Sequence, residues 1–302
     1  MLEVGLQMTK IKSQNLPLIA FCTLGVIWGS NFIYMKLAAN FITPMQIVFY
    51  RVLFGFVPVV IYARLRGDLR WQHLRHIGHY FVMGMLATAV YYYGYAKGAS
   101  LLLSGVAGAI SGAIPLFSFV LAVLFIAEEK ATRLKITGIL VGFVGVVIIG
   151  FPSGEGLASA NMEGVFYMVA GSLSVGASFV YAKKFIIPLK IPASALTTYQ
   201  LGLGLLVLAL FADYNGINNI FSNMHASIGL IVGLGLLGTG LAYIIYYYIV
   251  EKLGAVSASS VTYIPPIVAL LIGALLVGEP IKLADYGATL LIFTGVFLLK
   301  KK

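Results

Sequence analysis

A short segment occurs twice in this chain. Residues 28–36 read WGSNFIYMK, and residues 175–183 read VGASFVYAK. The second segment follows 147 positions after the first and repeats its glycine, phenylalanine, tyrosine and lysine in the same register. Other positions hold similar side chains, such as Ile33 and Val180. A repeat at this distance in a chain of 302 residues predicts two related halves of about 150 residues each.

The composition indicates a membrane protein. Hydrophobic residues make up 60% of the chain and charged residues only 10%, whereas about a quarter of the residues in a soluble domain are charged. Uncharged runs of roughly 20 residues, the length that a helix needs to cross a bilayer, recur along the chain. A β-barrel would instead show strands of about ten residues with alternating polarity. These runs are apolar all round, so we expect an all-α membrane protein.

Charged residues, prolines and polar clusters divide the chain into ten expected transmembrane helices. Their ranges are 17–37, 44–63, 77–96, 102–126, 134–151, 163–183, 193–212, 226–249, 255–277 and 283–299. Of the 20 Lys and Arg residues, 16 fall on the side of the bundle that also carries both termini. By the positive-inside rule this side is cytoplasmic. We therefore expect a multi-pass protein of the cytoplasmic (cell) membrane with both termini in the cytoplasm.

The two copies of the segment should cross the membrane in opposite directions, because five crossings separate them. The match extends through each half at offsets of 147 to 151 residues. It pairs Arg51 with Gln200, Thr88 with Thr239, Tyr92 with Tyr243, Tyr95 with Tyr246, Ser111 with Thr262, Pro115 with Pro266 and Glu128 with Glu279. We expect a five-helix repeat in residues 1–152 and a second, inverted five-helix repeat in residues 153–302. Inverted repeats of this kind form transporters that work by alternating access.

Several motifs resemble the drug/metabolite transporter superfamily and, within it, the ten-helix EamA family. They are W-G-S-N-F at 28–32, Tyr50-Arg51, and a proline followed 13 residues later by glutamate in each half, Pro115 to Glu128 and Pro266 to Glu279. The resemblance covers essentially the whole chain. It implies secondary transport, often export, of amino acids, other metabolites or drugs through a central cavity. The second half departs from the pattern because Val175 stands where the first half has Trp28.

Arg51 is the one charge that falls clearly inside an expected span, seven residues after Pro44, or roughly 10 Å along a helix. A charge at such a place costs about 2.5 to 3.5 kcal/mol on insertion scales, so its default role is in a cavity. There it would bind a substrate carboxylate. The alternative is structural: the guanidinium extends outward or binds helix-end carbonyls. Gln200 at the symmetric position favours a polar anchor in both halves.

Tyrosines are candidates for the wall of the cavity. Tyr92 and Tyr95 are three residues apart and share one helix face. Their counterparts Tyr243 and Tyr246 do the same. The other tyrosines of these two spans are expected in the belt at the membrane–water interface, the common place of tyrosine in membrane proteins. They are Tyr91, Tyr93, Tyr247 and Tyr248.

Polar residues and prolines complete the candidate site. Asn31 and Ser178 are matched mid-helix residues that bind either substrate or a neighbouring helix. Pro115 and the pair Pro265-Pro266 should break their helices near mid-membrane, either around a water-filled cavity or as packing kinks. The predicted substrate-binding residues are Trp28, Asn31, Arg51, Tyr92, Tyr95, Ser111, Ser178, Gln200, Tyr243, Tyr246 and Tyr263.

Other kinds of chemistry are disfavoured. The single cysteine, Cys22, cannot form a cysteine metal cluster, and the four histidines lie near span ends, so we expect no metal site. Acidic residues also fall near span ends, which leaves no intramembrane carboxylate for a proton relay, and no phosphate-binding G-x-x-x-x-G-K-[ST] loop occurs. The net charge of +10 sits mainly between spans and does not indicate nucleic acid. We expect no cofactor and no catalytic site.

The sequence thus predicts a secondary transporter of small organic metabolites, with amino acids or related carboxylates as the leading class and export as the expected direction. The alternatives are a passive channel or facilitator and an efflux carrier for amphipathic drugs. The expected partners are a small-molecule substrate and the lipid bilayer. The oligomeric state is open, and a monomer is compatible with the pattern.

Overall fold

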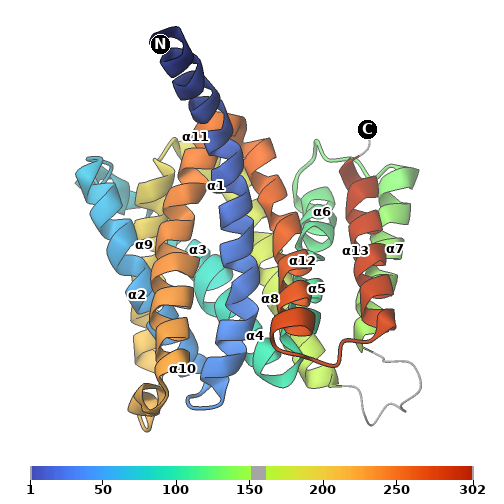
Figure 1. Cartoon of the computed structure of the whole chain (residues 1–302). Helices are drawn as coiled ribbons and strands as arrows, with labels where there is room; N and C mark the ends of the chain where they lie inside the picture. Colours follow the sequence, from blue (N-terminus) through green and yellow to red (C-terminus); the bar gives the residue numbers. More distant parts are fainter. Residues whose placement is uncertain (1, 151–160, 301–302) are drawn as a thin grey trace.

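The computed structural model describes residues 2–150 and 161–300, and all regular secondary structure within this part of the chain is helical. Figure 1 shows the helices packed in one bundle. Six stretches among the described residues are long and apolar enough to cross a membrane: Leu16–Ala39, Pro44–Leu65, Ser104–Phe125, Met162–Leu189, Ala193–Phe211 and Met224–Leu253. Val261–Leu276 and Leu283–Leu299 are shorter apolar helices. The expectation of a helical membrane protein is confirmed, and the count of ten crossings stays a prediction.

The helical elements follow most of the expected spans, with one difference. The eighth span was expected to end at residue 249 and the ninth to begin at 255, but one helix runs unbroken from Ala242 to Ser259, because the charges of Glu251 and Lys252 at its end do not interrupt it. The α-helices are α1 (Leu2–Ala39), α2 (Pro44–Leu65), α3 (Ile77–Gly84), α4 (Val90–Leu101), α5 (Ser104–Ser111), α6 (Ile114–Phe125), α7 (Arg133–Gly150), α8 (Met162–Tyr181), α9 (Ala193–Phe211), α10 (Met224–Ile228), α11 (Ala242–Ser259), α12 (Ile264–Leu271) and α13 (Leu283–Lys300). The π-helical segments are η2 (Met85–Ala89), η4 (Ala182–Ile186), η7 (Gly229–Leu241) and η9 (Ile272–Leu276). The 3₁₀ turns are η1 (Trp71–His76), η5 (Ile187–Leu189), η6 (Ile217–Ser222) and η8 (Ser260–Tyr263).

The start of α1 and the end of α13 lie at the same end of the bundle, at the top of Figure 1. We call this the terminal end. The other end, where α1 finishes and α2 begins, we call the far end. These two names fix the direction in which the candidate site opens.

Local sequence explains where α2 begins. Thr43 caps the helix: its hydroxyl accepts from the N–H of Gln46, and the Gln46 side chain accepts from the N–H of Thr43. Such a reciprocal pair satisfies two backbone donors that the first turn would otherwise leave without partners. Pro44 follows the cap, where its missing N–H costs nothing. The Gln46 amide also donates to the carbonyls of Asp213 and Asn215, which ties this cap to the second half of the chain.

The prolines predicted to break helices lie at helix starts. Helix α5 ends at Ser111, and α6 begins at Ile114 with Pro115 in its first turn. In the second half, η8 leads into α12, whose first turn contains Pro265 and Pro266. Proline has no N–H to donate to the preceding turn, so a helix can begin there but cannot run through it unchanged.

Glycines bring α7 and α13 into direct backbone contact, at the right of Figure 1. A Cβ atom added to Gly145 would lie 2.5 Å from the carbonyl oxygen of Ala288, and one added to Gly295 would overlap the backbone of Gly138 and Gly142. Small residues commonly serve this purpose between membrane helices, where close backbone approach replaces the hydrophobic driving force. This pair therefore needs glycine at its contact points.

Candidate functional site

A cavity of about 670 Å³ lies among helices from both halves of the chain. This volume is within the range of about 300 to 1,000 Å³ that is usual for small-molecule sites. All eleven residues predicted to bind substrate lie on its wall, as do Pro115 and Pro265. The third helix-breaking proline, Pro266, is buried close to Gly112 and is not among the wall residues. Sequence reasoning thus selected residues that the fold brings together, and their role in binding stays a prediction.

The cavity extends toward the terminal end of the bundle. The wall residues nearest that end come from the end of α6, the connection after it, the segment after α8, the start of α9 and the end of α13: Ile126, Glu129, Lys183, Ala193, Leu196 and Leu299. Among the described residues, the loops of the far end contribute none of the wall. The site is therefore open in one direction and covered in the other.

Arg51 is held at the cavity by neutral groups. Its side chain is buried, and its Nε donates to Thr239 Oγ1 at 3.1 Å. The guanidinium carbon lies 3.9 Å from the centroid of the Tyr92 ring, which is a cation–π contact. In the amide orientation that satisfies both of its polar atoms, the Asn31 oxygen accepts from Arg51 Nη2 at 3.2 Å and its nitrogen donates to the carbonyl of Ile27.

The positive charge of Arg51 is not paired with an acidic residue in the described ranges. Within the described part of the chain, no Asp or Glu lies within ion-pair distance of its guanidinium. A buried charge without a counter-charge is costly. Five N–H donors in a fixed planar fork suit the two oxygens of a carboxylate. An anion in the cavity would therefore provide the compensation that the protein itself does not.

The two halves place the same polar contact at equivalent positions. Gln200 Nε2 donates to Thr88 Oγ1 at 3.2 Å, as Arg51 Nε does to Thr239. Thr88 lies in η2 and Thr239 in η7, and π-helical turns of this kind frequently occur at functional sites. The two interpretations of Arg51 are thus compatible. Nε, Nη1 and Nη2 each direct one N–H to Thr239, Met35 and Asn31, and these contacts leave two of the five N–H donors unused at the cavity wall.

Replacing Thr239 with valine tests how much the hydrogen bond from Arg51 stabilises the protein. We expect a loss of about 1 to 3 kcal/mol in the free energy of unfolding, since a buried charged donor loses its acceptor. Thr88→Val is the matched change in the other half, and it should cost less because the donor there is a neutral amide. Thermal unfolding of the purified proteins in one detergent gives the comparison. Equal losses in the two variants would contradict a special role for the charge.

Two tyrosines expected at the membrane interface lie on the cavity wall instead. Tyr91 packs edge-on against Tyr95 with ring centroids 4.6 Å apart, and the Tyr247 hydroxyl donates to Thr197 Oγ1. The prediction for these two residues was wrong. The physical reason lies in η2 and η7, because a π-helical turn shifts the register of the helix that follows it. A sequence pattern read with a uniform period of 3.6 residues misses this shift.

An acidic residue also reaches the cavity. Glu129, in the connection after α6, lies on the wall near the terminal end and forms an ion pair with Lys183 at 2.7 Å. The hydrogen bond from Lys183 holds the pKa of the Glu129 carboxyl below its ordinary value, although partial burial opposes this. The residue is therefore ionised at neutral pH. Its position near a span end agrees with the sequence, but its place at the mouth of the cavity depends on how α6 and α8 pack.

Comparison with known proteins identifies the family. The model of the EamA-like transporter family matches residues 15–151 and, separately, residues 162–300. The chain belongs to this family. The resemblance inferred from the motifs is confirmed. Members of the EamA-like family are transporters, so the chain is a multi-pass membrane protein of the transporter type.

Relatives in several organisms agree with this assignment. An "Uncharacterized transporter" of Archaeoglobus fulgidus is 27% identical over 91% of this chain and 95% of its own length. The "Uncharacterized inner membrane transporter YedA" of Escherichia coli K12 is 28% identical over 94% of this chain and 91% of its own. A solved crystal structure with 18% sequence identity superposes with a TM-score of 0.62 over 95% of this chain and 96% of that one, and supports the fold. None of these names specifies a substrate.

Proposed function

We propose that this protein is a secondary transporter of small organic metabolites, with amino acids or related carboxylates as the leading class. It would use ten transmembrane helices, arranged as two inverted five-helix repeats in residues 1–152 and 153–302. Substrate would bind in the central cavity and reach one side of the cytoplasmic membrane at a time. The partners in this proposal are the small-molecule substrate and the lipid bilayer.

The observation that carries the proposal is the buried guanidinium of Arg51 at the cavity. It is fixed by Thr239, Asn31 and the Tyr92 ring, and none of these groups neutralises it. A preorganised donor costs little to reorganise when a ligand arrives, which favours binding. Tyrosines on the same wall offer apolar ring faces to the remainder of an amphipathic solute. A carboxylate attached to a small organic body fits both features.

Duplication of the halves is supported by two independent findings. One family model matches each half of the chain separately. The contacts of Arg51 with Thr239 and of Gln200 with Thr88 are equivalent at offsets of 149 and 151 residues. Related units that contact each other in this reciprocal way can exchange their conformations, which is the structural basis of alternating access.

The orientation in the membrane follows from charge. The side that carries 16 of the 20 basic residues should face the cytoplasm, and this is the terminal end toward which the cavity extends. In this orientation the cavity is open to the cytoplasm. Export stays the proposed direction because of the family resemblance, since an alternating-access carrier of either direction has a state that opens to the cytoplasm.

The structure favours a carrier over the alternatives. A passive channel needs a continuous path, whereas the cavity wall includes no far-end loop residue in the described part of the chain, so the cavity does not reach that end. An efflux carrier for amphipathic drugs would share the aromatic wall, but many such drugs are cations, and Arg51 would repel a cation in a site of low dielectric. Anionic amphiphiles are compatible with both proposals.

Ligand binding and counterflow test the proposed function. We expect that 3-phenylpropionate and phenylalanine, which carry a carboxylate, raise the melting temperature of the purified protein, whereas phenethylamine does not. A ligand at 100 times its Kd stabilises the folded state by about 2.7 kcal/mol, which is readily measured. Unlabelled solute loaded inside proteoliposomes should accelerate uptake of labelled solute, as in a carrier. Stabilisation by the amine alone, or uptake that does not respond to loading, would contradict the proposal.

A further inference from the structure

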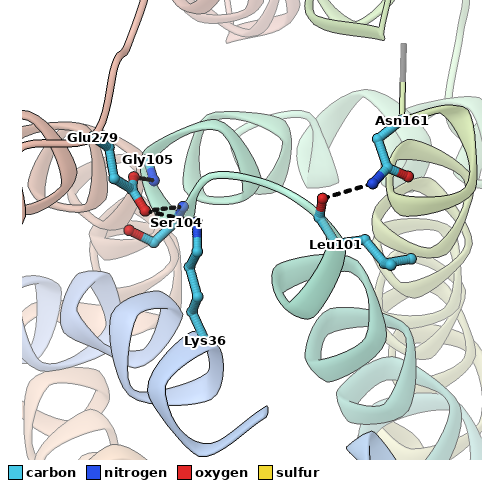
Figure 2. A network of polar contacts seen from close by, with 6 residues as sticks. All are labelled: Lys36, Leu101, Ser104, Gly105, Asn161 and Glu279. Carbon is cyan, nitrogen blue, oxygen red and sulfur yellow. Dashed lines mark hydrogen bonds and ion pairs between the residues drawn. The ribbon is translucent and has the colours of Figure 1, made fainter. Parts of the chain in front are cut away.

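Glu279 forms a compact polar network at the far end of the bundle, shown in Figure 2. Its side chain is only 5% exposed. One carboxylate oxygen accepts from Lys36 Nζ at 3.0 Å and from the N–H of Ser104 at 2.9 Å, and the other accepts from the N–H of Gly105 at 3.1 Å. The carboxylate thus caps the start of α5 and pairs with the end of α1. It joins three segments that lie far apart in the sequence.

The turn between α4 and α5 is held on both of its sides by the second half of the chain. Glu279 binds the N–H groups that begin α5, and Asn161 Nδ2 donates to the carbonyl of Leu101 at the end of α4 at 2.7 Å (Figure 2). The Asn161 oxygen also caps α8 by accepting from the N–H of Gly164. Because the first four N–H groups of a helix lack intrahelical partners, this cap stabilises the break.

Two glycines bring Glu279 into position. Gly278 has a φ of +69°, a left-handed conformation that glycine adopts without strain. A Cβ atom added to Gly273 would lie 2.5 Å from Glu279 Oε2, so the absence of a side chain there leaves room for the carboxylate. Burial alone would raise the pKa of Glu279, but the N–H donors of Ser104 and Gly105 together with Lys36 lower it below the ordinary value. The carboxylate is therefore charged at neutral pH.

The equivalent position in the other half has a different arrangement. The counterpart of Glu279 is Glu128, which is exposed. The counterpart of Lys36 is Lys183, which pairs with Glu129 at the open mouth of the cavity, where the two side chains are 53% and 30% exposed. Helix α11 (Ala242–Ser259) runs unbroken through residues 253–254, whereas the matching residues 102–103 form the break between α4 and α5. The two repeats therefore differ at the far end and at the terminal end, which are the two ends that open and close in turn during alternating access.

We propose that Glu279 is the latch that closes the far end, by capping α5 and binding Lys36, and that release of this carboxylate opens that end. The inference rests on the proposed alternating access and identifies its closing contact. In the reverse state the halves exchange roles: Glu128 caps a helix that begins near residue 255 and binds Lys183, while α11 breaks at residues 253–254. Helix α5 carries the change to the cavity, because its last residue, Ser111, lies on the wall.

Accessibility of a cysteine in the cavity tests the latch. Ser118 lines the cavity and is not a predicted substrate contact, so Ser118→Cys in a Cys22→Ala background provides one label site in the full chain. A membrane-impermeant maleimide applied from either side of vesicles measures accessibility. We expect labelling mainly from the terminal end. Glu279→Gln should raise the far-end rate about tenfold, which is the factor expected for loss of one charge-assisted hydrogen bond.

Matched variants separate the latch from simple destabilisation. Glu128→Gln removes the equivalent carboxylate and should leave far-end labelling unchanged or lower. Gly273→Ala keeps the charge but displaces the carboxylate, so it should also raise far-end labelling. The exchange Lys36→Glu with Glu279→Lys restores opposite charges but cannot cap α5, because lysine accepts no hydrogen bond. It should not restore the closed state, and full restoration would reduce the latch to an ion pair and overturn the inference.

The outcomes also distinguish this inference from the proposed function. Far-end labelling that Glu279→Gln and Gly273→Ala both leave unchanged, in variants with normal thermal stability and normal terminal-end labelling, would overturn the latch and leave the transporter proposal intact. Cysteine labelling from neither side would contradict the water-accessible cavity itself, and both proposals would fail. If Glu279→Gln does not yield folded protein, the result from Gly273→Ala decides.

Discussion

Replacing Arg51 with glutamine should reduce transport of a carboxylate substrate by about 100-fold or more, since two charge-assisted hydrogen bonds of about 1.5 to 3 kcal/mol each are lost. The stability of the protein should change little. Loss of the contact with Thr239 costs about as much as removal of an uncompensated buried charge gains, on the order of 2 to 3 kcal/mol for each. Uptake into proteoliposomes and thermal unfolding of the same preparation measure the two effects.

Two further arginine variants sharpen this test. Arg51→Lys keeps the charge but loses the planar fork, so we expect partial activity, about tenfold below that of the unchanged protein. Arg66→Gln removes an exposed arginine outside the cavity and should leave transport near normal. A large fall in melting temperature with Arg51→Gln, together with normal transport per folded molecule, would show that Arg51 is only an anchor.

Replacing Gly29 with alanine should destabilise the protein by about 1 to 3 kcal/mol, the usual cost of overpacking. A Cβ atom at this position would lie 2.5 Å from Cβ of Val268 and 3.0 Å from the carbonyl oxygen of Pro265. Neither atom can move easily, because one belongs to a stiff β-branched side chain and the other to the backbone. Gly29→Leu should prevent folding. The midpoint of thermal unfolding in detergent is the measurement.

Two other glycines serve as controls for Gly29. The repeat places Gly176 at the equivalent position, where the nearest atoms to an added Cβ are those of Ser118 and Phe117 at 3.1 to 3.3 Å. Gly176→Ala should therefore cost less. Gly287 lies on the exposed face of α13 with nothing within 4 Å, so Gly287→Ala should stabilise its helix by about 0.5 to 1 kcal/mol. Similar losses from all three variants would contradict the packing argument.

These glycines explain part of the repeated segment. Gly29 allows α1 to contact α12, and Gly176 allows α8 to contact α6. Helices α6 and α12 are those that begin with Pro115 and Pro265. Each copy of the segment thus packs against the proline-led helix of the other half. Asn31 and Ser178, two positions later, then reach the cavity wall. A single segment, used twice, both joins the halves and lines the space between them.

Much of the candidate site was accessible from the sequence. Arg51 could be predicted because a charge inside an apolar span is energetically costly and therefore usually has a functional role. Equivalent positions such as Tyr92 and Tyr243 could be predicted because a residue that is repeated in both halves is expected to have the same role in each. Tyr91 and Tyr247 were missed, since the π-helical turns that rotate them toward the cavity leave no clear mark in the hydrophobic pattern.

By itself the sequence determined that the chain is helical, membrane-embedded and of the EamA-like family, because apolar length and motif spacing are local properties of the chain. Only the tertiary structure decided which end of the cavity is open and that Glu279 reaches Ser104 and Lys36. Those contacts join residues 175 and 243 positions apart. They depend on how the helices rotate and pack against one another, and no pattern along the chain encodes that arrangement.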